Sequence, residues 1–335
     1  QSRSSAASDV YKRQGWSLPL FDSIDMSHPQ RESSEMTMAV LACGTMGTAI
    51  LSGVLDFQLS MENGDNSKDL AATSQHGESF ERVPLPKKYI ATVGRDSTAK
   101  RLASTFSEAG HSNVEVFQQR NVEAVRRSDI VLLCTKPQRV SEFMSEPGMK
   151  EALENKILVS IAAGTTINTI QKVVPPSTKV VRAMPNTPCR IREGMTVISD
   201  VTWLTHLERD LIATIFSAVG KCNFLDEKYF DAATALAGSG PAFVTLFLEA
   251  MTDGGVMMGL PRAEALELAA QTMQGAARMV LESGTHPAAI KDSVTTPGGC
   301  TIAGLLQMED GRVRSTVART IQTAAEHAAG LGKSS

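Results

Sequence analysis

The sequence predicts an α/β protein of two domains, in which a doubly wound parallel sheet is followed by an all-helical domain. Short apolar runs alternate with helix-compatible segments over the first half of the chain. From about Thr205 the strand pattern disappears and long apolar helical runs replace it. A length of 335 residues also exceeds the usual size of one compact core. We therefore expect a sheet domain over residues 36–204 and a helical domain over residues 205–335.

The expected strands are short and apolar, and small or polar residues follow them. They are Met38–Leu41, Tyr89–Val93, Val114–Phe117, Asp129–Cys134, Ile157–Ala162 and Lys179–Ala183. Helices are expected between them over Thr48–Leu55, Ala99–Ala109 and Asn121–Arg127. Strands that alternate with helices form parallel sheets, and ligands bind such sheets outside the carboxyl ends of the strands.

The first strand leads into a tight turn of small residues, Ala42-Cys43-Gly44-Thr45-Met46-Gly47, and then a helix. A strand, a glycine turn and a helix place a pyrophosphate at a helix N-terminus, as in Rossmann-like dinucleotide-binding domains. The fingerprint is imperfect because Ala42 stands where the first glycine is required. Taken alone, the motif is also explained by close packing of a helix on a strand.

The second strand ends in residues that bear on the choice of cofactor, Gly94-Arg95-Asp96-Ser97. An arginine at this tip accommodates the 2′-phosphate of NADP, whereas an acidic residue favours the free 2′-hydroxyl of NAD. Arg95 comes first and Ser97 adds a hydrogen-bond donor. The sequence therefore favours NADP(H), and Asp96 keeps NAD(H) as the alternative.

Two segments stand apart from the fold. Residues 1–35 are rich in serine and show no periodic pattern, and residues 9–14 can be encoded by a transposon end used in sequencing libraries. We expect them to be a non-native or disordered leader. Residues 56–88 are polar and contain glycine, serine and asparagine, which indicates an inserted surface loop.

The second domain contains helices with little polar surface. Pro241 begins an apolar run over Ala242–Met251, Pro261 begins another that reaches Leu281, and Gly311–Gly330 is amphipathic. A helix that is apolar on all sides must be buried. We therefore expect a homodimer through these helices, alone or within a larger homo-oligomer, with a monomeric bundle as the alternative.

Composition excludes several classes of partner. A net charge of -3 and an aromatic content of 5% give no reason to expect nucleic acid. No apolar run is long enough to suggest a membrane span. The five cysteines are far apart and form no Cys-x-x-Cys or Cys/His cluster, so neither a disulfide framework nor a metal site is indicated. We expect a protein of the reducing cytoplasm.

The most informative segment is residues 291–301, in which hydroxyl side chains flank Pro297-Gly298-Gly299 and a helix follows. Adjacent glycines permit unusual backbone angles and close approach to a ligand. The N–H groups of Gly299, Cys300 and Thr301 would lie unpaired at the helix start, which suits a carboxylate or phosphate. By itself, the segment favours the simpler interpretation of a turn with an N-cap.

The chain resembles the pyrroline-5-carboxylate reductase family, in particular its fungal-type members. The matching motifs are residues 291–301, 238–243, 253–261, 136–138 and 184–188, and the departures are Ala42, the leader and the insertion. The resemblance implies NAD(P)H-dependent reduction of the cyclic imine 1-pyrroline-5-carboxylate to L-proline, the last step of proline biosynthesis.

The resemblance also implies site residues. Thr301 would be catalytic, with its hydroxyl at the imine nitrogen. The implied substrate residues are Glu227, Thr296, Gly299, Cys300 and Thr301. The implied cofactor residues are Cys43, Gly44, Thr45 and Met46 at the pyrophosphate, Asn121 at the adenosine, Thr135, Lys136, Pro137 and Ala163 towards the nicotinamide, and Ser293 from the helical domain. A solvated surface charge is the alternative for Glu227. The active site must then form between domains, either within one chain or with a partner subunit.

Two other functions compete. One is a related imine reductase or a beta-hydroxyacid-dehydrogenase-like oxidoreductase of the same architecture. The hydroxyacid enzymes use a lysine on the first helix of the second domain, but no lysine occurs between Lys228 and Lys291. A general imine reductase would lack the Pro-Gly-Gly turn. The other is a cofactor-binding protein without catalysis, against which Thr301 and the complete cofactor loops argue.

Overall fold

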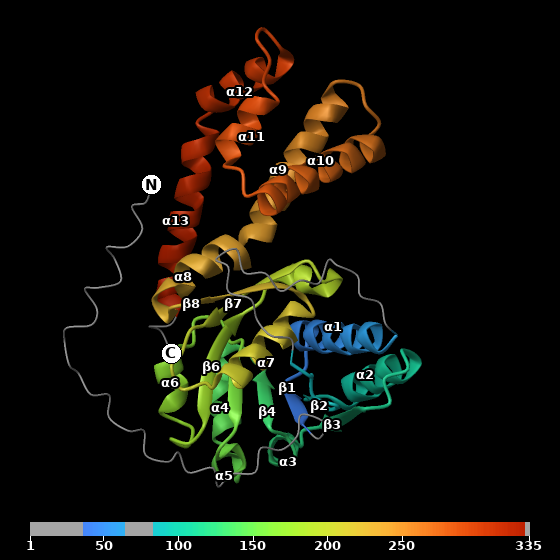
Figure 1. Cartoon of the computed structure of the whole chain (residues 1–335), viewed down its shortest axis with the longest axis vertical. Helices are drawn as coiled ribbons and strands as arrows, with labels where there is room; N and C mark the ends of the chain where they lie inside the picture. The colour runs from blue at the N-terminus through green and yellow to red at the C-terminus, as the bar shows by residue number, and fades with distance from the viewer. Residues whose placement is uncertain (1–35, 64–82, 332–335) are drawn as a thin grey trace, which may run out of the picture. The chain divides into compact units, whose positions relative to one another are not determined.

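The computed structural model describes residues 36–63 and 83–331, which form an eight-stranded sheet covered by helices and then a run of further helices (Figure 1). The strands are β1 (Thr37–Leu41), β2 (Lys88–Val93), β3 (Val114–Gln118), β4 (Ile130–Leu133), β5 (Ile157–Ser160), β6 (Lys179–Met184), β7 (Gly194–Ser199) and β8 (Gly220–Leu225). The leader at 1–35 and positions 64–82 of the expected insertion lie outside the described residues.

The helices that alternate with the strands are mostly short. They are α1 (Thr45–Glu62), α2 (Asp96–Glu108), α3 (Asn121–Arg126), η3 (Pro137–Arg139), α4 (Val140–Met144), α5 (Met149–Leu153), α6 (Ile167–Gln171), η4 (Thr187–Ile191) and α7 (His206–Ser217). The strand order is β3-β2-β1-β4-β5-β6-β7-β8. All neighbouring strands are parallel except β6 and β7, so the predicted doubly wound sheet is confirmed with one antiparallel pair.

Both faces of the sheet are buried. Along β1, Met38 and Val40 pack into one apolar cluster with α1, α2 and α7, while Ala39 and Leu41 pack into another with α3 to α6. Side chains of a strand alternate between faces, so a strand covered on both sides must be apolar throughout. This explains why the central strands β1, β4 and β5 stand out in the sequence as apolar runs, whereas the edge strand β3 includes the exposed Glu115 and Gln118.

The expected surface loop at 56–88 is wrong at both ends. Helix α1 continues to Glu62, and Phe57 is buried in the core. Strand β2 already begins at Lys88. The polar residues after Asp56 lie on the outer face of α1. This face can be polar because the helix is buried on one side only.

The strand pattern does not disappear at Thr205, so that expectation is also wrong. Thr205 caps α7 in a reciprocal hydrogen-bonded box with Glu208, and β8 then pairs with β7 over Gly220–Leu225. The sheet therefore continues beyond the expected boundary at residue 204. Strand β8 lies at the edge of the sheet and includes Lys221 and Asn223, which is why no apolar run marks it.

The C-terminal part contains only helices. They are η5 (Glu227–Tyr229), α8 (Phe230–Ala233), a π-helical turn η6 (Thr234–Gly238), α9 (Gly240–Met257), α10 (Arg262–Ser283), α11 (Pro287–Ser293), α12 (Cys300–Asp310) and α13 (Val313–Leu331). The expected helices after Pro241 and Pro261 and at the C-terminus are confirmed. Gly284 ends α10 with a φ of 64°, the left-handed conformation expected of a glycine cap.

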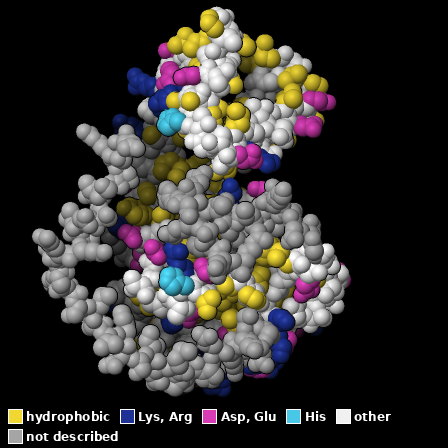
Figure 2. Space-filling model, viewed as in Figure 1, with side chains coloured by type: hydrophobic (Ala, Val, Ile, Leu, Met, Phe, Trp, Pro, Cys, Tyr) yellow, Lys and Arg dark blue, Asp and Glu magenta, His cyan; other side chains and the backbone are white. Residues whose placement is uncertain are grey.

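Helix α9 is apolar but is not buried within one chain, where Thr252 is its only buried residue. Leu246 is 65% exposed and Met257 is 89% exposed. Figure 2 shows hydrophobic side chains gathered on this helical part of the surface. By length and composition alone, the helical stretch Glu227–Met257 could cross a membrane, because an 18-residue window within it has a mean hydropathy of 1.2. The expectation that no apolar run reaches that length was therefore wrong on these two criteria.

Candidate active site

Several predicted cofactor residues lie at one edge of the sheet. The register pairs Leu41 with Leu133 and Leu133 with Ser160, so the parallel strands β1, β4 and β5 end side by side. The loops that follow these strands contain, in turn, Cys43 to Met46, Thr135 to Pro137, and Ala163. The structure thus brings these three predicted loops to the same edge.

The turn after β1 leaves its backbone open. Gly44 is exposed, and a Cβ built there would meet only the Ala42 carbonyl oxygen, at 3.8 Å. Gly47 has the opposite role, since its Cβ would come within 3.1 Å of Cys134 Sγ and 3.2 Å of Val40 Cγ1. Helix α1 can therefore approach the sheet closely and present its first N–H groups outward, an arrangement that fits a dinucleotide pyrophosphate.

The predicted adenosine side contains Arg95, Ser97 and Asn121. Arg95 is the N-cap residue of α2, and both Arg95 and Ser97 are exposed at the carboxyl end of β2. Asn121 Nδ2 donates to Glu146 Oε1 at 2.6 Å, and Thr92 Oγ1 donates to Asn121 Oδ1 at 2.7 Å. These two bonds fix the orientation of the Asn121 amide.

The cysteine of the turn is not a reactive group. Cys43 is buried with its Sγ 3.7 Å from Thr48 Oγ1, and burial raises the pKa of its thiol to about 11. Burial likewise raises the pKa of Cys134. The Cys43 thiol therefore stays neutral, and its backbone is the part that a cofactor can reach. In the part of the chain that is described, no group of three or more His, Cys, Asp or Glu side chains could hold a metal ion.

The Pro-Gly-Gly segment forms a tight turn before α12. Gly298 has a φ of 68°, and a Cβ on Gly299 would lie 2.5 Å from Thr296 Oγ1. Both positions therefore favour glycine. The expectation for Gly299 was wrong in one respect, because its N–H donates to the Thr296 carbonyl at 3.1 Å. The N–H groups of Cys300 and Thr301, in the first turn of α12, precede any partner within the helix.

The structure does not bring this segment against the cofactor edge within one chain. Helix α12 packs on α13 and α11 packs on α10, and among the described elements neither makes an extensive contact with the sheet. Ser293, the predicted cofactor contact from the helical domain, is exposed and its hydroxyl donates to the Ile290 carbonyl at 2.7 Å. The predicted site residues thus fall into two groups, one on the sheet edge and one around Thr301.

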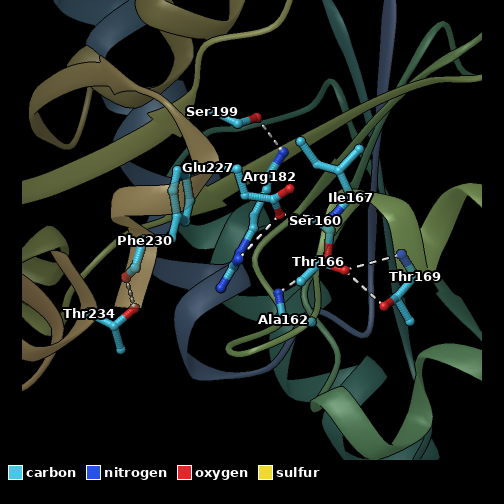
Figure 3. A network of polar contacts seen from close by, with 10 residues as sticks. All are labelled: Ser160, Ala162, Thr166, Ile167, Thr169, Arg182, Ser199, Glu227, Phe230 and Thr234. Atoms are coloured by element: carbon cyan, nitrogen blue, oxygen red, sulfur yellow. Dashed lines mark hydrogen bonds and ion pairs between the residues drawn. The ribbon is translucent and has the colours of Figure 1, made fainter. Parts of the chain in front are cut away.

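Glu227 is not a solvated surface charge. Its Oε1 accepts a hydrogen bond from the Ile167 N–H at 2.9 Å and another from Arg182 Nη1 at 3.2 Å (Figure 3). The Arg182 side chain is 5% exposed, and its guanidinium carbon lies 4.6 Å from the centre of the Phe230 ring. Glu227 and Arg182 line a cavity of about 370 Å³ together with Gly164 of the loop after β5.

Arg182 was missed by sequence reasoning. Its signal was available, because it is the one cation inside the otherwise apolar run Val180–Met184. A charge in a buried strand needs a partner, which here is Glu227. Arg101 and Arg190 were also missed, and they line a groove of about 470 Å³ beside the turn after β1. Nothing in their sequence context marks them.

Comparison with known proteins gives two family matches. The family described as pyrroline-5-carboxylate reductase dimerisation matches residues 227–331, and the family described as NADP oxidoreductase, coenzyme F420-dependent, matches residues 37–164. The pyrroline-5-carboxylate reductase of Schizosaccharomyces pombe is 45% identical over 294 residues, which are 88% of this chain and 98% of that protein. The enzyme of Neurospora crassa is 43% identical over 333 residues, covering 92% of this chain and 96% of the relative.

Solved structures agree with these matches. The pyrroline-5-carboxylate reductase of Coxiella burnetii superposes with a TM-score of 0.73 at 26% identity, covering 90% of this chain and 99% of that one. The enzyme of Plasmodium falciparum with NADP bound gives a TM-score of 0.69 at 26% identity, covering 89% of this chain and 98% of that one.

The fold and the sheet edge define an oxidoreductase with an NADP-binding domain and a helical dimerisation domain. Within that class, the chain belongs to the pyrroline-5-carboxylate reductase family. The resemblance noted in its motifs is confirmed. Its reaction is the NAD(P)H-dependent reduction of the C=N bond of 1-pyrroline-5-carboxylate, which yields proline.

Proposed function

We propose that the segment Thr296–Thr301 forms the substrate half of the active site and that Thr301 is its catalytic residue. The observation that supports this is the geometry of the turn. The left-handed Gly298 and the crowded Gly299 bring the chain into α12 so that the N–H groups of Cys300 and Thr301 stand free. Such a helix start suits the substrate carboxylate, and the Thr296 hydroxyl adds a donor beside it.

The reduction needs three groups around the imine. A bound nicotinamide cofactor supplies the hydride to the C=N carbon. The Thr301 hydroxyl, which can donate and accept, hydrogen-bonds at the imine nitrogen. The N–H groups of Cys300 and Thr301 hold the carboxylate and so fix the ring against the cofactor edge. No residue of unusual pKa is required, because a pyrroline nitrogen is basic enough to arrive protonated.

NADPH is the proposed reductant in preference to NADH. Arg95 and Ser97 follow β2, where the adenosine ribose of a dinucleotide lies in this fold. A guanidinium there pairs well with a 2′-phosphate. The remaining cofactor positions in this proposal are the turn from Cys43 to Met46, the loop from Thr135 to Pro137, Asn121, Ala163 and Ser293.

The active site is proposed to form between two chains of a homodimer. The exposed apolar surface of α9 supports pairing through the helical domain, because such a surface is costly to leave in water. Among the described residues, helix α12 makes no extensive contact with the sheet of its own chain, which supports delivery of Thr301 to the cofactor edge of a second chain. In a two-fold dimer each chain delivers its Thr301 to the cofactor edge of the other. This arrangement is also compatible with a larger homo-oligomer.

The test of the catalytic assignment compares Thr301→Ala with Thr301→Ser. We expect Thr301→Ala to lower kcat/KM for 1-pyrroline-5-carboxylate by about 10²-fold, the usual loss for one positioned hydrogen-bonding group, while NADPH binding is unchanged. Thr301→Ser keeps the hydroxyl and should retain most of the activity. Equal activity of the wild type and Thr301→Ala, measured by NADPH oxidation, would refute the assignment.

The shared site is tested by mixing two inactive proteins. Thr301→Ala removes the substrate group, and Gly44→Asp places a carboxylate against the cofactor phosphates. If the site is shared, each mixed dimer has one intact site, so random re-pairing restores about a quarter of the wild-type activity. Mixtures that stay inactive although mixed dimers form would place Thr301 and Gly44 of one site in the same chain.

The same assay distinguishes the competing enzyme classes when 1-pyrroline-5-carboxylate is compared with cyclic imines that lack a carboxylate, because a related imine reductase would prefer the latter.

The cytoplasmic location stays a prediction, to be checked by fractionation of the source cells.

A further inference from the structure

Arg182 is a buried cation in the middle of a strand. It lies in β6 opposite Ser160 of β5, and its side chain is 5% exposed. Its backbone N–H donates to Ser199 Oγ at 2.9 Å, which fixes the strand at this position. A guanidinium taken out of water is costly unless a negative group compensates it. The compensating group in the described chain is Glu227.

The Glu227 carboxylate is held by one of its two oxygens. Oε1 accepts from both Arg182 Nη1 and the Ile167 N–H, whereas no described residue donates to Oε2. The Glu227 side chain is 30% exposed and borders the cavity of about 370 Å³. One oxygen is therefore anchored in the protein, and the other is free to accept a hydrogen bond from a bound molecule.

This network joins parts of the chain that are far apart in sequence. Glu227 lies 45 residues from Arg182 and 60 residues from Ile167. Ile167 begins α6, directly after the loop that contains Ala163, while Glu227 begins the helical part. Phe230 lies one turn further and stacks on the guanidinium, as Figure 3 shows. Arg182 and the Ile167 N–H thus together hold Glu227 at this place.

We infer that Arg182 is a positioning residue of the active site, which holds Glu227 so that its free oxygen faces the substrate beside the loop at Ala163. The inference rests on the proposed function and on the role in binding 1-pyrroline-5-carboxylate that the family resemblance implies for Glu227, which we propose for this chain. Arg182 itself need not touch the substrate. Its planar fork offers Nη1 to Glu227 while its face rests on Phe230, a combination that a lysine cannot reproduce.

The chain contains a matched control on the same strand. Lys179, at the start of β6, donates to both carboxylate oxygens of Glu208 at 2.7 Å. Glu208 belongs to α7, and this ion pair lies at the opposite end of β6 from the loops of the cofactor edge. Lys179→Met therefore removes an ion pair of β6 without altering Glu227.

The experiment compares steady-state kinetics and thermal unfolding of Arg182→Met, Arg182→Lys, Glu227→Gln and Lys179→Met. We expect Arg182→Met to raise KM for 1-pyrroline-5-carboxylate about tenfold, with kcat changed less than about threefold and KM for NADPH unchanged, the pattern of lost ground-state binding. Arg182→Lys should give a smaller rise. The double variant Arg182→Met/Glu227→Gln should be no worse than the more harmful single variant, because both remove one interaction.

The outcomes distinguish the inference about Arg182 from the role of Glu227 in substrate binding on which it rests. If Glu227→Gln leaves KM for the substrate unchanged, the proposed role of Glu227 fails. If Glu227→Gln raises KM but Arg182→Met lowers only Tm, as Lys179→Met does, Arg182 is structural and the inference is overturned. Should Arg182→Met not fold, Arg182→Lys decides the matter, since an unchanged KM in that variant likewise overturns it.

Discussion

Thr92 donates a hydrogen bond of 2.7 Å to Asn121 and accepts one of 3.2 Å from the Ala42 N–H. A single hydroxyl thus connects the end of β2, the start of α3 and the turn after β1. These are three of the loops at which a dinucleotide is expected to bind, so the cofactor edge is organised before any cofactor arrives. Such preorganisation lowers the ordering cost of binding.

The first prediction concerns Asn121. Asn121→Ala removes the amide that Thr92 and Glu146 orient, so we expect the Kd for NADPH to rise by about tenfold, or roughly 1.4 kcal/mol. The control is Asn113→Ala, which breaks a 3.0 Å hydrogen bond to the Lys87 carbonyl at the opposite end of β2. Fluorescence titration of NADPH measures both, and equal affinities for the two variants would contradict the prediction.

The second prediction concerns Ala42, which has a φ of 52°. This left-handed conformation costs a residue with a Cβ roughly 1–2 kcal/mol, and glycine avoids that cost while losing about 0.5–1 kcal/mol of chain entropy. Ala42→Gly should therefore raise Tm slightly, by roughly 1–3 °C. Ala42→Val should lower it. A Tm that falls in the glycine variant would show that the turn is not strained.

The third prediction concerns cofactor choice. Removing the exposed Arg95 guanidinium by Arg95→Ala should reduce kcat/KM for NADPH by about tenfold and leave that for NADH nearly unchanged. Lys100→Ala is the matched control, because Lys100 is an exposed cation on the same helix that already pairs with Asp96 at 2.7 Å. The assay compares the two cofactors on each variant. An equal loss of kcat/KM with both cofactors would mean that Arg95 does not bind the 2′-phosphate.

The fourth prediction concerns thiol modification. Cys300 is exposed and begins α12, whereas Cys43, Cys189 and Cys222 are buried. Iodoacetamide at neutral pH should therefore modify Cys300 first and abolish activity by blocking the carboxylate site. L-proline should slow the modification, and Cys300→Ser should resist it. Peptide mass mapping identifies the modified residue, and rapid labelling that leaves activity intact would place Cys300 outside the site.

The fifth prediction concerns stability at high pH. Burial raises the pKa of Cys43 from 9.0 to about 11, so the folded protein holds this proton over a range in which the unfolded chain has lost it. The resulting stabilisation is complete below pH 9 and is lost as the pH rises through about 11; it amounts to about 3 kcal/mol at most. Cys43→Ala should flatten the fall in unfolding free energy between these pH values. Urea unfolding measures it, and an unchanged slope would exclude Cys43 as the cause.

Much of the fold could be predicted because burial on both faces leaves a clear trace in sequence. The central strands β1, β4 and β5 are apolar runs, and the glycine that ends α10, Gly284, is a local signal. Strand β8 left no such trace, since an edge strand tolerates Lys221 and Asn223. The extension of α1 was missed for a related reason, because Phe57 is its last buried residue and the residues that follow, 58–62, are partly or fully exposed.

The site could be predicted only in its local parts. The turn after β1 and the Pro-Gly-Gly segment are each continuous in sequence, so their residue types alone indicate a site. The network of Arg182, Glu227 and Ile167 joins distant positions, and no spacing in the sequence relates them. The Gly299 N–H was misjudged because its acceptor, the Thr296 carbonyl, depends on the angles of the turn and not on residue types.

The exposed apolar surface of α9 has a consequence for the activity of the enzyme in dilute solution. If two chains must meet to cover it, the active species is governed by mass action, and specific activity becomes a function of enzyme concentration. Strong dilution should then inactivate the protein slowly, at the rate of subunit dissociation. A newly made chain that has not yet paired exposes the apolar surface of α9 to water. We therefore expect it to be prone to aggregation until it dimerises.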